Sequence, residues 1–363
     1  MAKLKTVFIL GAGASRQAGA PLMSDFLDIA TSLRRSGRAG AYESQFDTVF
    51  EAIGALQLVH SKARLDILNI ESVFAAFEFA QIIKSFCGYD PANIATLPDA
   101  ARALITQTIE ETVRFPLDHG SPQAPPPYPA FAELVFGLRE WCRPAHDVVV
   151  VTFNYDFALD FAFRSIRPGV DYGLDERRTH ADALPLLKLH GSISWAECSV
   201  DRAIVTQSFG DFMAGKSIAG MSGSLKIDFS THFRSLSHCG NRVNAQPILV
   251  PPTWNKSSYH GVLASVWATA ARELAAADNI FVIGYSLPDT DVFFRYLYAL
   301  GTVGKHPLER FWVFDPDDTG AVHKRFLSLL GPGAEQRFRF VKYPFDAAIN
   351  VIRSDLAVPA GPL

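Results

Sequence analysis

The sequence is poor in cysteine, and its few cysteines are far apart. The 363 residues contain four of them, Cys87, Cys142, Cys198 and Cys239. No two form a Cys-x-x-Cys pair, so the spacing indicates neither a disulfide framework nor a four-thiolate zinc site. Free thiols are typical of a reducing compartment, and we therefore expect the protein in the cytoplasm.

Long apolar runs and a large excess of one charge are also lacking. The first apolar run, Thr6 to Leu10, ends at Gly11 and is too short for the core of a signal peptide. No later run approaches the roughly 18 apolar residues of a membrane helix. The formal net charge is −3 at pH 7, which gives no general attraction to nucleic acid or to an anionic membrane. We therefore expect no membrane association and no direct nucleic-acid binding.

The chain does contain strand-like and helix-like segments in alternation. With 48% hydrophobic residues it can bury a substantial core. Apolar residues are nearly continuous in six short runs, which is typical of buried parallel strands: 6–10, 148–153, 186–189, 248–250, 279–283 and 311–314. Helical patterns cover 156–166, 261–277 and 289–300. The alternation predicts an α/β fold, a Rossmann-type doubly wound parallel sheet.

The first two predicted strands are too far apart for an ordinary connection, which in α/β units has about two to six residues. Helical periodicity over 41–114 and a proline-rich connector at 121–129 predict a helical insertion at 41–140. The Rossmann-like domain then comprises 1–40 and 141–355. Within it, the segment 196–246 is rich in Ser and Gly and is expected to be an irregular insertion or flap. Residues 356–363 form a tail.

Ligands of open parallel sheets bind beyond the carboxyl ends of the strands. The first predicted strand is followed by Gly11-Ala12-Gly13-Ala14-Ser15. Small residues let the backbone approach a pyrophosphate, and a following helix would offer N–H groups to it. The dinucleotide fingerprint Gly-x-Gly-x-x-Gly requires glycine where Arg16 stands. Taken alone, this loop fits a phosphate site and a plain tight turn equally well.

Polar residues also follow four other predicted strands, and each has a structural interpretation beside the functional one. Asp156 could be a helix cap, His190 a satisfied core residue, and Asp289 or Thr290 the cap of the next helix. An acidic residue at a strand end is how such folds hold a ribose diol. A dinucleotide site accounts for all of these strand ends together; its residues are Asn154, Asp156, His190, Gly284, Ser286 and Asp315.

The order of these motifs resembles the sirtuin family. Gly-Ala-Gly-Ala-Ser at 11–15, Thr-Phe-Asn-Tyr-Asp at 152–156, Leu-His-Gly at 189–191 and Gly-Tyr-Ser-Leu at 284–287 correspond to four sirtuin motifs. The resemblance implies an NAD+ site with His190 as the base and Asn154 and Asp156 on the nicotinamide-ribose side. It also implies cofactor-binding positions at Gly11, Ala12, Gly13, Ser15, Gly284, Ser286 and Asp315.

The departures from the deacylase pattern indicate a particular branch of that family. Deacylases carry a four-cysteine zinc module after His-Gly, whereas residues 196–246 hold only Cys198 and Cys239. Adding His232 and His238 gives a Cys2His2 set with unfavourable spacing, so we expect no zinc and no metal site. The runs at 69–71, 251–256 and 284–291 resemble sirtuin-like proteins of bacterial antiphage defence, which hydrolyse NAD+.

The resemblance implies an NAD+ hydrolase that uses NAD+ as its substrate. It would release nicotinamide and ADP-ribose, or a cyclic isomer, and deplete NAD+ in infected cells as an abortive-infection effector. A homo-oligomer is expected, as is a partner ATPase or another defence protein. Two other functions stay open: an NAD+-dependent deacylase or ADP-ribosyltransferase, and a non-catalytic module that senses NAD+ or ADP-ribose.

Overall fold

The computed structural model describes residues 3–57, 65–167, 169–175, 182–217, 222–250, 260–289, 291–302 and 306–359. The motif at 251–256, Thr290 and residues 360–363 of the predicted tail lie outside these ranges. Within the described ranges, no helix combines the length and the apolar composition needed to cross a bilayer.

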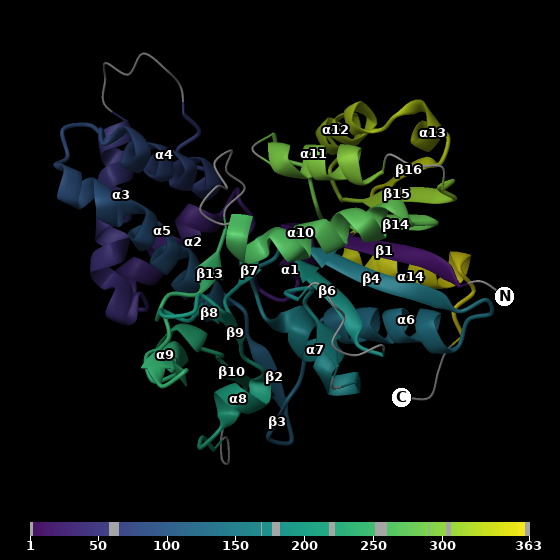
Figure 1. The fold of residues 1–363 in the computed structure, drawn as a ribbon, viewed down its shortest axis with the longest axis horizontal. Coiled ribbons are helices and arrows are strands. Elements are labelled where there is room, and N and C mark those ends of the chain that lie inside the picture. The colour runs from purple at the N-terminus through teal and green to yellow at the C-terminus, as the bar shows by residue number, and fades with distance from the viewer. Residues whose placement is uncertain are drawn as a thin grey trace.

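A seven-stranded sheet forms the centre of the molecule (Figure 1), and all of its strand pairs are parallel. The strand order is β16-β15-β14-β1-β4-β6-β5. In chain order the strands are β1 (Leu4–Leu10), β4 (His146–Thr152), β5 (Val170–Asp171), β6 (Leu184–Lys188), β14 (Asn279–Ile283), β15 (Arg310–Phe314) and β16 (Phe338–Val341). The predicted doubly wound parallel sheet is confirmed.

One strand predicted for the central sheet lies outside it, and two strands of the central sheet were not predicted. The run 248–250 forms β13 (Ile248–Leu249), which pairs antiparallel with β7 (Gly191–Ser192) outside the central sheet. Its apolar composition reflects burial, and burial alone does not specify a parallel sheet. The missed strands β5 and β16 are the two edges of the sheet. They are only partly buried, so they lack a continuous apolar run.

Helices cover both faces of the sheet. In Figure 1, α10 crosses in front of the strands and α14 lies behind them. The helices are α1 (Ala12–Ser15), α2 (Phe26–Arg35), α3 (Glu43–Leu56), α4 (Ile70–Ile83), α5 (Pro91–Thr112), α6 (Tyr128–Glu140), α7 (Ala158–Ile166), α8 (Phe209–Met213), α9 (Phe229–Phe233), α10 (His260–Ala275), α11 (Val292–Gly301), α12 (Ala321–Leu329), α13 (Pro332–Glu335) and α14 (Phe345–Asp355), with a 3-10 turn at Gly40–Tyr42.

The predicted helical insertion contains two kinds of helix. Helices α3 and α4 both pack on α5 to one side of the sheet (Figure 1), whereas α6 packs against β4 and α7. The division into domains stays a prediction, but α6 is part of the layer that covers the sheet.

Residues 196–246 are more regular than a flap. The short strands in and around this segment are β8 (Trp195–Glu197), β9 (Ile204–Thr206), β10 (Ser224–Leu225), β11 (Ser237–His238) and β12 (Asn241–Arg242). β8 pairs with β9, β11 pairs with β12, and β10 pairs with β2 (Phe115–Asp118), which is also paired with β3 (Ser121–Pro122). The segment is therefore attached to the chain that precedes α6.

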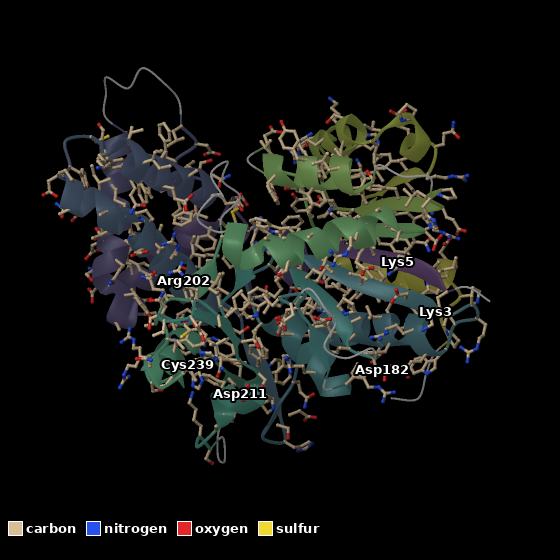
Figure 2. All side chains as sticks on the ribbon, in the orientation of Figure 1. Lys3, Lys5, Asp182, Arg202, Asp211 and Cys239 are labelled. Carbon is tan, nitrogen blue, oxygen red and sulfur yellow. The ribbon has the colours of Figure 1, made fainter. Side chains whose placement is uncertain are left out.

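The order in which the chain adds strands to the sheet reverses at β1. From β1 the chain continues to β4 and β6 on one side, and it later returns to β14 on the other side. The carboxyl ends of β1 and β14 therefore lie at a topological switch point, where α/β folds place their ligands. Lys3 and Lys5 lie at the opposite, amino end of β1, away from helices α3 to α5 (Figure 2).

Candidate active site

A cavity of about 640 Å³ lies at the carboxyl ends of the parallel strands. Loops that follow β1, β4, β6, β14 and β15 line it, together with the start of α4 and part of α5. Nine of the predicted site residues line this cavity: Ala12, Gly13, Ser15, Asn154, Asp156, His190, Gly284, Ser286 and Asp315. Gly11 is not among the described residues that line it.

The hydroxyl of Ser15 links the two polar residues that follow β4. The Nδ2 group of Asn154 donates to Ser15 Oγ at 2.7 Å and to the carbonyl oxygen of Gly11 at 2.9 Å. Ser15 Oγ in turn donates to Asp156 Oδ2 at 2.6 Å, and it lies 2.7 Å from the hydroxyl of Tyr128. Ser15 is 1% exposed. Its hydroxyl is therefore engaged within the protein, where it orients Asn154 and Asp156.

Asp156 is a buried carboxylate that is held on several sides. Burial raises its pKa above the usual value, although the charge of Lys188 and the hydrogen bonds from Ser15 and the Ala158 N–H act in the opposite direction. The N–H of Ala158, the first residue of α7, donates to Asp156 Oδ1 at 2.9 Å. The N-cap of α7 is Phe157, so the prediction of Asp156 as the cap is wrong, although its carboxylate accepts the first N–H of the helix from the residue before the cap.

Lys188 is a buried basic residue in the otherwise apolar strand β6, and two hydrogen bonds account for its burial. Its Nζ donates to Asp160 Oδ2 at 2.8 Å and to the carbonyl oxygen of Asp156 at 2.6 Å. Both side chains of the Lys188–Asp160 pair are at most 1% exposed. The hydroxyl of Tyr172 donates to the other oxygen of Asp160 at 2.7 Å. A buried ion pair of this kind requires such additional hydrogen bonds, and this one anchors the strand that leads to His190.

His190 follows β6 and is buried at the cavity. Its carbonyl oxygen accepts the Val250 N–H at 2.8 Å. The next residue, Gly191, has a φ of +82°, and a Cβ there would lie 2.2 Å from the carbonyl oxygen of Ile248. Only glycine fits this position, because β13 approaches so closely. The His-Gly pair therefore places an imidazole at a strand end where the chain must also turn.

A carboxylate that sequence reasoning did not select lies beside this imidazole. Asp291 Oδ2 is 3.8 Å from His190 Nε2, and the Asp291 side chain is 1% exposed. The hydroxyl of Tyr285 donates to the same Oδ2 at 2.7 Å, and the Phe294 N–H donates to Oδ1 at 3.3 Å. Asp291 is thus the cap of α11, so the prediction of Asp289 or Thr290 is wrong for Asp289, and Thr290 lies outside the described residues.

Aromatic rings enclose the same side of the cavity. Phe153 stacks on Tyr285 with ring centroids 4.0 Å apart, and its ring meets that of His190 edge-on at 5.0 Å. Phe153 and Tyr285 both belong to motifs quoted above. An aromatic side chain in a sequence, however, does not indicate whether it lines a cavity or packs in the core. Nor could spacing single out Asp291 from the two acidic or hydroxyl residues just before it.

The glycines after β1 and β14 serve the packing of two loops. The Gly13 N–H donates to the Gly284 carbonyl at 2.8 Å, and the Gly11 N–H donates to that of Ile283 at 3.1 Å. A Cβ on Gly11 would lie 2.5 Å from the Cα of Tyr285. The expected helix after β1 is the single turn α1. These contacts explain Gly11 by backbone packing, which is the tight-turn alternative.

Cationic and polar groups lie at another part of the cavity wall. Arg325 lines the cavity, and its Nε donates to the carbonyl oxygen of Ser286 at 2.8 Å. Burial raises the pKa of Asp315 above its usual value, with Asp317 adding to the effect. From the insertion, Asn69 caps α4 by accepting the Glu71 N–H at 2.9 Å. Arg325 had no motif around it that could have marked it in the sequence.

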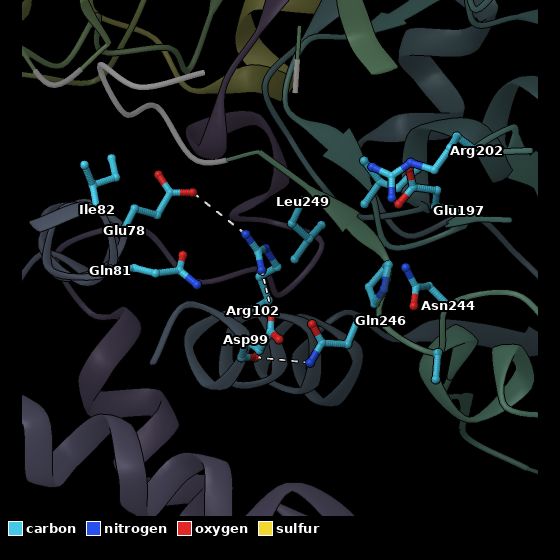
Figure 3. Close-up of a pocket in the computed structure, with 13 residues that line it drawn as sticks. Glu78, Gln81, Ile82, Asp99, Arg102, Glu197, Arg202, Asn244, Gln246 and Leu249 are labelled. Carbon is cyan, nitrogen blue, oxygen red and sulfur yellow. Dashed lines mark hydrogen bonds and ion pairs between the residues drawn. The ribbon is translucent and has the colours of Figure 1, made fainter. Parts of the chain in front are cut away.

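A second cavity, of about 630 Å³, lies between helices α4 and α5 and the segment 197–249 (Figure 3). Arg102 lines it, and its guanidinium pairs with two acidic side chains: Nη1 lies 2.5 Å from Asp99 Oδ1 and Nη2 lies 3.8 Å from Glu78 Oε1. Its described lining includes none of the predicted site residues.

No protein-family model matches the chain, and no curated protein sequence matches it. Solved structures do resemble it. A Sir2 homologue in complex with NAD is 15% identical, covers 97% of this chain and 90% of its own, and has a TM-score of 0.44. Sir2Tm bound to a propionylated peptide is 12% identical, covers 98% of this chain and 94% of its own, and has a TM-score of 0.39. Similarity at this level carries no functional inference for this chain.

Proposed function

We propose that this chain is an NAD+ hydrolase that cleaves the bond between nicotinamide and ribose, releasing nicotinamide and ADP-ribose or its cyclic isomer. One observation carries the proposal: His190, Asn154 and Asp156, from the ends of two adjacent strands, line one cavity at the switch point of a doubly wound sheet. The sequence motifs that contain these residues resemble those of sirtuins, in the same order along the chain.

The leaving group determines which catalytic groups are needed. The nicotinamide nitrogen is cationic in NAD+ and departs neutral, so no acid has to protonate it, unlike the leaving oxygen of an ordinary glycoside. What remains is to stabilise a ribose with oxocarbenium character, to exclude bulk water and to activate one water molecule. His190 takes the role of base, because an imidazole is the side chain suited to accept a proton near neutral pH.

Asp291 supports that base electrostatically. When His190 takes a proton from water, the imidazole becomes cationic, and a carboxylate 3.8 Å away stabilises the charge. The side chains are at most 5% exposed, so solvent screens this interaction little. The Tyr285 hydroxyl holds the carboxylate in place.

Asn154 and Asp156 have different roles in this proposal. Asn154 directs its amide toward Ser15 and Gly11, and its remaining carbonyl oxygen serves the ribose hydroxyls. Asp156 is turned toward Ser15 and Ala158, so it acts as a positioning residue for Ser15 and Asn154. Arg325 supplies positive charge for the diphosphate beside Ser286, and Asp315 holds the second ribose.

An unrestrained NAD+ hydrolase would deplete its own host. We therefore propose that a partner protein or assembly of copies restrains the activity, and that the protein acts in the cytoplasm as an effector of antiphage defence. None of the four cysteines forms a disulfide, as that compartment favours.

One assay on the purified protein distinguishes three functions: NAD+ hydrolase, deacylase and non-catalytic sensor. NAD+ is incubated with the protein alone and with an acetylated peptide, and nicotinamide, ADP-ribose and peptide are separated by chromatography. We expect nicotinamide release from NAD+ alone that the peptide does not accelerate. Deacylation faster than hydrolysis would make the protein a deacylase, and binding without consumption would make it a sensor.

A further inference from the structure

Four metal-binding side chains meet where two hairpins of the segment 196–246 touch. Cys198 and Asp201 come from the loop between β8 and β9, and His238 and Cys239 come from β11 and the turn that follows it. One ligand atom of each lies within 4.8 Å of the other three. We name these residues the Cys2HisAsp cluster. It lies away from the cavity, in the part of the molecule where Figure 2 labels Cys239 and Arg202.

The backbone of the first hairpin places two of the ligands. The Cys198 N–H donates to the Ala203 carbonyl at 2.9 Å, and the Cys198 carbonyl accepts the Arg202 N–H at 3.2 Å. The Ala203 N–H also donates to Asp201 Oδ1 at 3.0 Å, which leaves Oδ2 directed at the cluster. This loop therefore folds back so that a thiol and a carboxylate point the same way.

The second hairpin supplies the other two ligands through its turn. Cys239 and Gly240 have φ values of +51° and +75°, as the two central residues of a type I′ turn do. The Asn244 N–H donates to the Glu197 carbonyl at 2.8 Å and joins the two hairpins. A cysteine with positive φ is unusual, and here the turn brings its sulfur to the opposing loop.

The distances fit a single ion at the centre. Cys239 Sγ lies 3.0 Å from Asp201 Oδ2 and 3.2 Å from His238 Nδ1, and these last two atoms are 3.5 Å apart. Bond lengths of about 2.3 Å to sulfur and about 2.0 Å to nitrogen or oxygen place tetrahedral ligands roughly 3.3–3.8 Å apart. The spacing is close to that range. Two thiolates and an imidazole favour Zn²⁺ over Mg²⁺ or Ca²⁺, which prefer oxygen ligands.

We propose that the Cys2HisAsp cluster binds one structural Zn²⁺ ion. This replaces the expectation of no metal, and the ligand set differs from the one weighed in the sequence. His232 is not part of it, because its Nε2 bonds to Gln207 Oε1 at 2.9 Å. Asp201 takes the fourth position, and an aspartate was not considered there.

The ion would fasten a segment that supports the His190 turn. After β12 the chain runs into β13, which pairs with Gly191 and Ser192. Strands β8, β9, β11 and β12 have two or three residues each, too few to hold one another by backbone pairing alone. A metal cross-link between the two hairpins compensates for this, and its loss is expected to lower the unfolding temperature.

Elemental analysis of the full-length protein, purified with a thiol reductant and without chelator, tests the proposal. We expect about one Zn²⁺ per chain in the wild type and at least about fivefold less in Cys198→Ser and His238→Ala. The matched controls His232→Ala and Cys87→Ser are expected to keep the metal. After exchange for Co²⁺, the wild type should show thiolate-to-cobalt charge-transfer absorption.

Variants at Asp201 separate loss of the ligand from loss of the fold. The side chain is exposed on one side, so Asp201→Ala should fold, as circular dichroism will show, and yet lose metal. Asp201→Cys restores a fourth ligand and should retain it. Wild-type protein that takes up no Zn²⁺ under reducing conditions would overturn the proposal. So would equal metal content in all variants, or a Cys198–Cys239 disulfide in the reduced sample.

Discussion

At the scale of single residues, the contact between His190 and Asp291 matters most for the proposed chemistry. His190 could be selected from the sequence because it follows a predicted strand and precedes glycine. Asp291 could not, because three residues in succession offered a polar side chain before α11. Only the folded chain shows that Tyr285 and Phe294 orient the carboxylate toward the imidazole.

Replacing Asp291 by Asn isolates its charge. Asn still caps α11 through its one carbonyl oxygen, and its amide group can donate to the Tyr285 hydroxyl, so the fold should be unchanged. Loss of the negative charge beside His190 should lower kcat for NAD+ hydrolysis on the order of 10- to 100-fold, with KM nearly constant. Steady-state kinetics will check this, with exposed Asp318→Asn as the control. An unchanged kcat would remove Asp291 from the mechanism.

The buried carboxyl group of Glu110 should make the unfolding free energy depend on pH. This carboxyl group of α5 is buried, and it accepts hydrogen bonds from the N–H and hydroxyl of Ser230 at 2.9 and 2.8 Å. Burial, with Asp228 adding to it, raises its pKa to about 8. The folded state therefore binds a proton that the unfolded state has released between about pH 4.5 and pH 8. That contribution to stability is present below this window and is lost as the pH rises through it.

Glu110→Gln should remove this pH dependence, since Gln resembles the protonated acid. The wild type should lose up to about 1.4 kcal/mol of unfolding free energy per pH unit across the window from this group, and the variant should not. Urea titrations at several pH values between 5 and 8.5 will measure the difference. Exposed Glu335→Gln should behave like the wild type. Parallel curves for wild type and Glu110→Gln would contradict the prediction.

At the scale of elements, buried strands were predictable and their partners were not. Strands β1, β4, β6, β14 and β15 are buried on both faces, so their apolar runs identify them. β13 has the same composition, but it is buried against β7, and only tertiary pairing distinguishes the two cases. The edge strands β5 and β16 are half exposed, which removes the signal.

The close packing of the loops after β1 and β14 should make the protein sensitive to any side chain at Gly284. Gly284 has a φ of +61°, and a Cβ there would lie 2.4 Å from the backbone nitrogen of Ala14. Gly284→Ala should therefore cost at least about 2 kcal/mol of unfolding free energy and displace the loop 11–15. Gly331→Ala, where a Cβ meets nothing within 4 Å, should change stability by less than about 0.5 kcal/mol. Chemical denaturation of both variants decides the matter, and equal stabilities would refute the packing explanation.

At the scale of the whole molecule, the strand order determines where a ligand binds. Because the strands are parallel and the strand order reverses at β1, loops from sequence positions near 12, 154, 190, 285 and 315 converge on one cavity. The sequence indicated this edge through the polar residues at successive strand ends. It did not indicate the contribution of α4 and α5 to the cavity wall, since contacts between an insertion and a sheet leave no local pattern.

We propose that this cavity holds NAD+ and that His190 is the base in its hydrolysis. The direct test is the initial rate of nicotinamide release from NAD+ by the wild type and by His190→Ala, with exposed His119→Asn as the control and ADP-ribose binding measured for each. We predict release by the wild type and the control, and a rate at least about 100-fold lower for His190→Ala with ADP-ribose binding retained. Absence of NAD+ consumption by the wild type, or equal rates for wild type and His190→Ala, would contradict it.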